Sequence, residues 1–455
     1  MIKVPFSTGQ AFKAPVATSL RCHGMGLLES IKPQSEGQRR LVEALLNEAY
    51  AIVGIFGPTG SGKSLFSLAY GIESVTKGRF KRFLVVKPVI DVVTGRELTL
   101  AEAGEEFVRL AREYLVDVLG SFVEPARISE LMDSGRLVLT DGHYLKGRTF
   151  DDTLLLLDDA QHIKLETLLE VIVRIGSRSR LIIAADPIFQ TLRGVHQDHV
   201  TTLREILLSE ANAYVVDLGI EDIVREGAKT GIRFLLEYIL RSRKLQESEA
   251  RALQVIKLHS PDADVVTVVD IEETAKKYGI SLEHVPKYLV VVKPGHLGRL
   301  VGKGGERISG IEKELGGRVR GMELDLDLTS YIRSVHPVSW IWKRVRVDLM
   351  GSYLAIKAGS ESLGPLLGQK GSYIRFLDEV TTKLMGLSVR VVPVSEKVEP
   401  AKPERRPRKR SSRREGRAQP GSSADQQTSR PSSQQPQTSG QGSQTSSGIS
   451  PATQG

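Results

Sequence analysis

Short apolar runs alternate with longer stretches of helical spacing through the first half of the chain. Continuous apolar runs separated by amphipathic segments are typical of a parallel sheet that is covered by helices on both faces. The pattern therefore predicts an α/β domain, which a helical segment at about Ile232–Glu247 closes. The predicted strands are Ala51–Phe56, Phe83–Val86, Leu137–Leu139, Leu154–Leu157, Leu181–Ala185 and Tyr214–Leu218.

The pattern changes in the second half of the chain. Between Tyr288 and Val394, short strands, glycines and short helices follow one another on a smaller scale, which predicts two small α+β modules. From Gln419 to Gly455 the chain is mostly Ser, Gln, Thr, Gly and Pro, with almost no large apolar residue. Such a segment buries too little apolar surface to offset the entropy of ordering, so we expect a disordered tail. The predicted divisions are 1–250 for the sheet domain, 251–284 for a connector, 285–340 and 341–398 for the small modules, and 399–455 for the tail.

The basic residues are concentrated in one place. The 455-residue chain has a formal net charge of +9, and residues 401–418 hold nine Lys or Arg against two Glu. This run is either a solvated linker or a segment that attracts phosphate groups without sequence preference. Cys22 is the single cysteine, which excludes an internal disulfide and a cysteine-based zinc site. With no secretory pattern at the start and no apolar run long enough to span a bilayer, we expect a cytoplasmic protein away from membranes.

A glycine-rich segment after the first predicted strand fits the pattern G-x-x-x-x-G-K-[ST] and precedes a helical run, Leu65–Ser74. Its residues are Gly57, Pro58, Thr59, Gly60, Ser61, Gly62, Lys63 and Ser64. Glycines let successive backbone N–H groups face phosphate oxygens, while the lysine supplies a positive charge and the serine hydroxyl a Mg²⁺ ligand. The segment therefore predicts an ATP site that uses Mg²⁺; the alternative is a plain glycine turn.

The predicted strand Leu154–Leu157 delivers two carboxylates, Asp158 and Asp159, at its C-terminal end. Parallel sheets place their ligands at this edge. Alone, the pair is equally explained as a structural feature of a strand end. Together with the glycine-rich segment it predicts a magnesium ligand, Asp158, and a residue that orients the attacking water, Asp159.

These motifs resemble the PhoH-like ATPases, whose nucleotide domain is related to superfamily 1 helicase cores. The resemblance runs from about Ile31 to Gly227 and rests on Gln38, Lys87-Pro88, Lys146–Thr149, Asp158–Gln161, Arg174–Gly176 and Asp222–Arg225. Three positions depart from the family pattern: Asp159 stands for a usual Glu, Lys87 for a usual Arg, and the stretch from Ala185 to Gln190 is one residue longer.

The resemblance also implies roles for three residues outside the glycine-rich segment. Gln38 would read adenine, and Gln190 would be the sensor near the γ-phosphate. Arg225 would act as an arginine finger, within one subunit or between subunits of a homo-oligomeric ring. An ion pair of Arg225 with Glu221 or Glu226 is the alternative.

Two further glycine loops begin 66 residues apart, each between two short helical stretches. Their residues are Gly302, Lys303, Gly304 and Gly305 in the first, and Gly368, Gln369, Lys370 and Gly371 in the second. A G-x-x-G loop lets a nucleic-acid backbone approach closely, and a lysine in it meets phosphate. One such loop is weak support, but repetition at the length of one module favours two KH modules that bind RNA. Val301–Gly305 and Leu363–Gly371 resemble archaeal-type paired KH proteins.

Two functional hypotheses follow from the sequence. The first is an ATPase whose hydrolysis of Mg²⁺-ATP is linked to RNA held by KH modules. The second is an RNA-binding protein in which the ATP site acts as a slow switch without motor activity. Low aromatic content, 5% of residues, argues against base-stacking platforms such as the RRM or the OB-fold.

Overall fold

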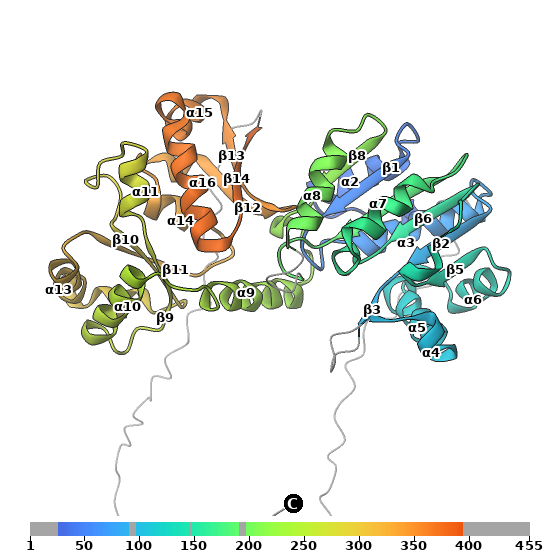
Figure 1. Ribbon diagram of the computed structural model, residues 1–455, viewed down its shortest axis with the longest axis horizontal. Helices are drawn as coiled ribbons and strands as arrows, with labels where there is room; N and C mark the ends of the chain where they lie inside the picture. The colour runs from blue at the N-terminus through green and yellow to red at the C-terminus, as the bar shows by residue number, and fades with distance from the viewer. Residues whose placement is uncertain (1–25, 91–96, 146, 191–196, 395–455) are drawn as a thin grey trace, which may run out of the picture. The chain divides into compact units, whose positions relative to one another are not determined.

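The computed structural model describes residues 26–90, 97–145, 147–190 and 197–394 (Figure 1). Cys22, the basic run and the predicted tail lie outside these residues. The first half of the described chain contains one sheet of six strands in the order β5-β2-β6-β7-β1-β8, all parallel. The strands are β1 (Ile52–Phe56), β2 (Arg82–Val86), β5 (Leu137–Thr140), β6 (Thr153–Leu157), β7 (Arg180–Ala185) and β8 (Ala213–Asp217). The predicted parallel sheet is confirmed.

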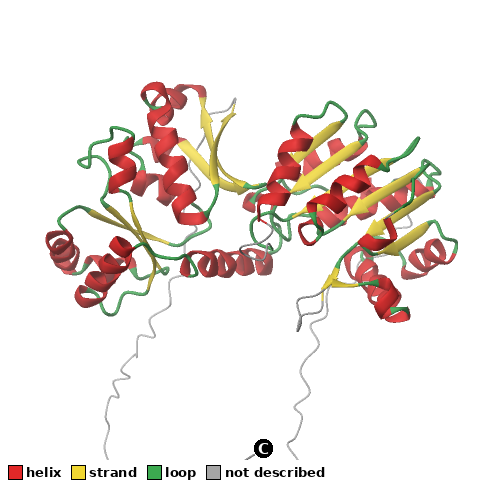
Figure 2. Ribbon diagram, in the orientation of Figure 1, coloured by secondary structure: helices red, strands yellow, loops and turns green. Residues whose placement is uncertain are grey.

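Both faces of this sheet are buried, which explains the continuous apolar runs in its strands. Along β6, Leu154 and Leu156 enter one core, and Leu155 and Leu157 enter the other. Helices lie along both faces, as Figure 2 shows in red against the yellow strands. The first core includes residues of α2 (Glu36–Leu46), α3 (Lys63–Thr76), α5 (Glu105–Leu119) and α6 (Pro125–Asp133), and the second includes residues of α7 (Leu165–Val173) and α8 (Gln197–Leu208).

The closing helix begins and ends six residues earlier than predicted, and it has the predicted length of 16 residues. It is α9, Glu226–Arg241, rather than a helix that continues to Glu247. The chain turns after Arg241, and the Arg243 guanidinium pairs with the buried carboxylate of Glu249, 2.9 Å away, in the next helix. This ion pair involves two charged residues, which leave no mark on the spacing of apolar residues. The turn therefore could not be predicted from that spacing.

Two three-stranded sheets of the same topology follow. In each, the middle strand pairs antiparallel with the strand before it and parallel with the strand after it. The first sheet holds β9 (Val265–Asp270), β10 (Tyr288–Val292) and β11 (Val319–Glu323), and the second holds β12 (Val345–Met350), β13 (Tyr353–Gly359) and β14 (Ser388–Val394). The stretch predicted as a connector, 251–284, thus contributes β9 to the first sheet.

Three helices of each small sheet repeat in the same order, while α11 (Glu272–Lys277), between β9 and β10, has no counterpart between β12 and β13. A helix precedes each sheet, and two helices on either side of a glycine loop follow each middle strand. The preceding helices are α10 (Glu247–His259) and α14 (Thr329–Val335); the loop-flanking helices are α12 (Leu297–Val301) with α13 (Glu306–Leu315), and α15 (Ser360–Leu367) with α16 (Ser372–Met385). The repeat suspected from the two glycine loops therefore extends to every strand and to these helices.

Candidate nucleotide site and glycine loops

The glycine-rich segment forms the turn from β1 to the N-terminus of α3. Gly60 and Gly62 have φ values of 88° and 99°, a region that glycine enters at little cost. A Cβ placed on Gly57 would lie 2.6 Å from the Leu218 carbonyl oxygen, so this position also lacks space for a side chain. The loop thus presents its backbone at the start of a helix, where N–H groups and the helix dipole favour phosphate.

Lys63 is the first residue of α3 and lies inside this loop. Its Nζ donates to the carbonyl oxygens of Gly57, at 2.7 Å, and Pro58, at 2.9 Å. Burial lowers the pKa of Lys63, although the nearby carboxylate of Asp186 opposes the shift. The ammonium group therefore lies within the loop that we expect to surround phosphate, as the motif predicts.

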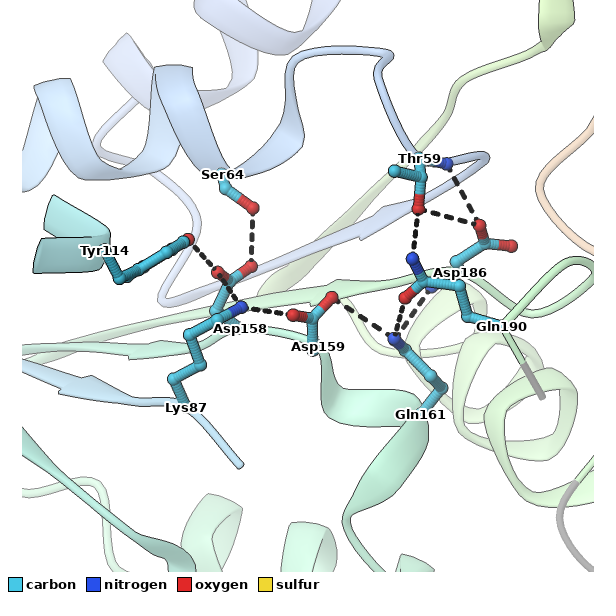
Figure 3. A network of polar contacts seen from close by, with 9 residues as sticks. All are labelled: Thr59, Ser64, Lys87, Tyr114, Asp158, Asp159, Gln161, Asp186 and Gln190. Atoms are coloured by element: carbon cyan, nitrogen blue, oxygen red, sulfur yellow. Dashed lines mark hydrogen bonds and ion pairs between the residues drawn. The ribbon is translucent and has the colours of Figure 1, made fainter. Parts of the chain in front are cut away.

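Ser64 and Asp158 bring two oxygen ligands together across the sheet edge (Figure 3). The Ser64 hydroxyl donates to Asp158 Oδ1 at 2.8 Å, and Asp158 is fully buried at the end of β6. A hydroxyl and a carboxylate are hard oxygen donors of the kind that Mg²⁺ prefers, and Mg²⁺ is commonly held by one or two such groups together with substrate phosphates. The donor set fits the predicted metal.

Two residues complete the surroundings of Asp158. Lys87, directly after β2, places Nζ 3.3 Å from Asp158 Oδ2 and also contacts Asp159. Tyr114 of α5 donates its hydroxyl to Asp158 Oδ2, and the Lys87 ammonium lies 4.3 Å from the Tyr114 ring centre. Burial lowers the pKa of Lys87, but both carboxylates outweigh it and raise that pKa above its usual value. Sequence reasoning missed Tyr114, which belongs to no motif and has an ordinary place on an amphipathic helix.

A row of polar side chains joins Asp159 to the phosphate loop (Figure 3). Gln161 Nε2 donates to Asp159 Oδ1 at 3.2 Å and to Gln190 Oε1 at 2.7 Å, and Gln190 in turn donates to the Thr59 hydroxyl. Despite the extra residue before it, Gln190 therefore lies at the site. Burial raises the pKa of Asp159, but Lys87 outweighs it and holds that pKa below its usual value.

Asp186 supports the tip of the phosphate loop from β7. Its Oδ2 accepts from the Thr59 backbone N–H at 3.0 Å, and its Oδ1 accepts from the N–H groups of Ile188 and Phe189. Burial raises the pKa of Asp186, although Lys63 opposes this shift. The aspartate thus holds the tip of the phosphate loop against the backbone segment that follows β7.

Gln38 lies against the phosphate loop but its side-chain amide is already engaged. Nε2 donates to the carbonyl oxygens of Ser61, at 3.1 Å, and Asp222, at 3.2 Å, and Oε1 accepts from the Gln34 N–H at 2.8 Å. In the structure, the Gln38 side chain therefore links the phosphate loop to the backbone of Asp222 by hydrogen bonds. Its predicted contact with adenine would require these bonds to be exchanged.

Arg225 is exposed and directly precedes α9. The two acidic residues considered as its partners bond to lysines instead: Glu221 to Lys357, at 2.6 Å, and Glu226 to Lys229, at 3.4 Å. Within the described residues, no ion pair holds the Arg225 guanidinium. Its role as an arginine finger stays a prediction.

The two later glycine loops have the same backbone geometry. Both begin with a glycine at positive φ, 78° at Gly302 and 71° at Gly368, and a Cβ there would lie within 3 Å of Arg307 and Tyr373 respectively. The central residues are exposed in both loops; they are Lys303, Gly304, Gln369 and Lys370. Each loop ends with a left-handed glycine that directly precedes a helix. Both loops therefore expose backbone and one lysine, at the second position of the first loop and at the third position of the second.

A parallel α/β sheet with this phosphate loop and this acidic strand end defines a P-loop NTPase domain. Residues 30–237 match the family model described as PhoH-like protein. The chain is 27% identical over 202 residues to a PhoH-like protein of Mycobacterium leprae, covering 43% of this chain and 56% of that protein. It is 32% identical over 158 residues to Protein PhoH2 of Thermobispora bispora, covering 34% and 36% respectively. These findings support a PhoH-like P-loop NTPase.

The comparisons reach only part of the molecule. The family match ends at residue 237, before β9, and the chain spans about half the length of the Mycobacterium relative. A solved structure of a DNA replication initiation factor is similar at 18% identity and a TM-score of 0.21, over 68% of this chain and 85% of that chain. Among the helices that the structure describes, none has the length and apolar character needed to cross a membrane.

Proposed function

We propose that the protein is a Mg²⁺-dependent ATPase whose turnover is linked to RNA, and that the RNA is bound by two KH modules of archaeal type. The observation that carries the ATPase is the contact of Ser64 with Asp158 beside the phosphate loop, because it joins the two predicted magnesium ligands. The observation that favours RNA is the repetition of an exposed glycine loop in two modules of one topology.

Each polar residue at the proposed ATP site has a distinct task. The loop N–H groups and Lys63 would bind the β and γ phosphates, and Ser64 with Asp158 would hold Mg²⁺, which neutralises charge between them. Asp159 would orient water, because its contact with Lys87 keeps it ionised and able to accept a hydrogen bond. Gln190 would sense the γ-phosphate through its contact with Thr59.

The glycine loops would bind the backbone of single-stranded RNA. Their first glycines leave no room for a side chain, and the exposed lysines, Lys303 and Lys370, meet phosphate oxygens. Bases would then face the neighbouring apolar surface between loop helix and sheet. The order of strands and helices, with the loop between two helices after the middle strand, agrees with a KH module.

A hydrolysis assay on the full chain tests the proposal. Replacing Lys63 by alanine should reduce ATP hydrolysis by roughly 100-fold or more, since the variant loses a buried positive charge at the phosphates. Lys77→Ala is the matched control, because Lys77 caps the other end of α3 and is exposed. Single-stranded RNA should change the rate of the parent protein and of this control alike.

Three outcomes separate the parts of the proposal. Unchanged turnover in Lys63→Ala would contradict the ATPase. Hydrolysis that depends on Lys63 but ignores RNA, in a protein that binds RNA, would favour the switch hypothesis over RNA-linked turnover. Absence of RNA binding by the parent protein would contradict the KH assignment.

A further inference from the structure

The turn after β8 contacts the hairpin of β12 and β13 in the second small sheet. The Gly351 N–H, in the hairpin turn, donates to the Leu218 carbonyl at 3.1 Å, and Gly219 forms a β-bridge with Met350. The Ile220 N–H donates to Asp348 Oδ1 at 2.9 Å. Asp348 is 2% exposed, so this carboxylate is enclosed by the contact.

Glycines on both sides of the contact allow this close approach. A Cβ on Gly219 would lie 2.0 Å from Asp348 Oδ2, and a Cβ on Gly351 would lie 2.3 Å from Asp217 Oδ1. Gly219 has a φ of −115°, which any residue adopts. The position therefore excludes a side chain through lack of space and not through backbone conformation.

The same turn is tied to the phosphate loop through Asp222. One oxygen of its carboxylate accepts from the Gly219 N–H at 2.7 Å, and the other accepts from the Ser35 hydroxyl at 2.6 Å and the Gly37 N–H at 3.0 Å. Its backbone carbonyl accepts from Gln38, which also donates to Ser61 of the phosphate loop. Hydrogen bonds, connected by the backbone of the turn Gly219–Asp222, thus link Asp348 to the phosphate loop.

The hairpin also leads directly to the second glycine loop. Lys357 of β13 pairs with Asp348 at 3.4 Å and with Glu221 at 2.6 Å. Tyr353, at the start of the same strand, donates to Asp217 at 3.2 Å. β13 is followed by α15 and then by the loop at Gly368. One strand therefore joins the contact with the turn to the loop proposed to bind RNA.

We infer that the second small sheet positions the phosphate loop, and that Asp348 is the positioning residue through which it acts. Asp348 would hold the turn Gly219–Asp222, and that turn, through Asp222 and Gln38, would hold Ser61 in the shape that binds ATP. The inference rests on the proposed binding of ATP. The second small sheet, which lies outside the P-loop domain, would thus contribute to the binding of ATP.

Binding of ATP to the full chain, measured by isothermal titration calorimetry with Mg²⁺, tests the inference. Asp348→Ala should raise the Kd for ATP about tenfold, within the range typical of coupling between sites. Thr381→Val is the matched control, because it removes a buried hydrogen bond with Tyr331 inside the same module and leaves the contact with the turn intact. This control should lower the melting temperature without changing the Kd.

A double variant distinguishes positioning from a general loss of stability. Gly219→Ala should raise the Kd for ATP as Asp348→Ala does, since the new methyl group meets the Asp348 carboxylate. In the Asp348→Ala background that carboxylate is gone, so adding Gly219→Ala should have little further effect. If Gly219→Ala raises the Kd for ATP equally in the parent and in Asp348→Ala, the turn alone causes the rise. That result would overturn the inference.

The outcomes also separate this inference from the proposed function. A parent protein that does not bind ATP would contradict the proposed function itself. A parent that binds ATP, with Asp348→Ala binding it equally tightly, would overturn the positioning role and leave the ATPase proposal standing. A rise in Kd for Thr381→Val equal to that of Asp348→Ala would assign the effect to module stability and likewise overturn the inference.

Discussion

Asp158 and Asp159 are neighbours in the chain, but their environments give them different chemistry. Asp158 is fully buried and contacts the hydroxyl groups of Ser64 and Tyr114 as well as Lys87, 3.3 Å away. Asp159 is partly exposed, has a φ of 51°, and contacts Lys87. Consecutive side chains of an extended strand point to opposite faces of the sheet, but the backbone at Asp159 is left-handed, and both carboxylates reach Lys87. These different environments agree with the roles proposed for Asp158 at the metal and for Asp159 at the attacking water.

The Tyr114 hydroxyl gives a prediction for the metal. Tyr114→Phe removes the donor to Asp158 Oδ2 but keeps the ring against Lys87. Groups that hydrogen-bond to a metal ligand typically contribute 10- to 100-fold in metal affinity or activity, so we expect roughly 10-fold more Mg²⁺ to be needed for half-maximal hydrolysis. Tyr50→Phe, whose ring lies 4.9 Å from Tyr214, is the control. Identical magnesium titrations for the two variants would show that Tyr114 does not orient Asp158.

At the scale of elements, the sequence predicts those whose signal is local. Every strand of the large sheet is an apolar run, and the phosphate loop is a contiguous motif, so both could be predicted. The end of α9 at Arg241 and the pairing of β9 with β10 depend on contacts between distant residues. Tyr114 and Asp348 reach their partners only through packing across the fold. No pattern within their own segments could have identified them.

The packing of α3 on the sheet gives a prediction about stability. A Cβ on Gly71 would lie 2.2 Å from the ring of Phe83 in β2, where both residues are buried. Gly71→Ala should therefore lower the free energy of unfolding by about 1–3 kcal/mol, as overpacking does in closely packed cores. Gly231→Ala, in α9, is the control. Apart from its chain neighbours and the backbone of its own helix, a Cβ at this position would have no atom within 4 Å. Alanine there should stabilise the helix by about 0.5–1 kcal/mol.

Chemical denaturation of both glycine variants measures the difference. If Gly71→Ala does not lower the free energy of unfolding relative to Gly231→Ala, α3 must move away from β2 without a cost in free energy. Since α3 begins at Lys63, such a movement would also displace the end of the phosphate loop.

At the scale of the whole molecule, a P-loop domain precedes two repeats of one small module, and the repeats differ in what they contact. The second repeat meets the turn after β8 through Asp348 and Gly351. In the first repeat, Asp270 occupies the end of the strand equivalent to β12, and its N–H bonds to Glu249 of the preceding helix. The hydrogen bonds described above that lead to the phosphate loop start from the second repeat. If both loops bind RNA as proposed, we expect them to have unequal effects on ATP.

That asymmetry gives a prediction for the two loops. Asp-Asp in place of Lys303-Gly304 or of Gln369-Lys370 would set carboxylates against the phosphate path, and RNA affinity should fall in both variants. Gly304 and Lys370 have φ values of 64° and 51°, a region in which aspartate is among the better tolerated residues, so both modules should stay folded. Circular dichroism checks the fold, and fluorescence anisotropy measures binding at a salt concentration that screens the basic run of residues 401–418.

The two variants should differ in their effect on turnover. With RNA at saturation, the first-loop variant should keep the response of ATP hydrolysis to RNA, whereas the second-loop variant should lose it, because coupling requires that both ligands favour one shared arrangement. Basal hydrolysis should be the same in both, since the loops lie outside the residues that bind phosphate and metal. Loss of the response in both variants would mean that the first module also acts on the nucleotide site, through contacts other than those of Asp348. If both variants keep the response of ATP hydrolysis to RNA, RNA binding at these loops does not act on the ATP site.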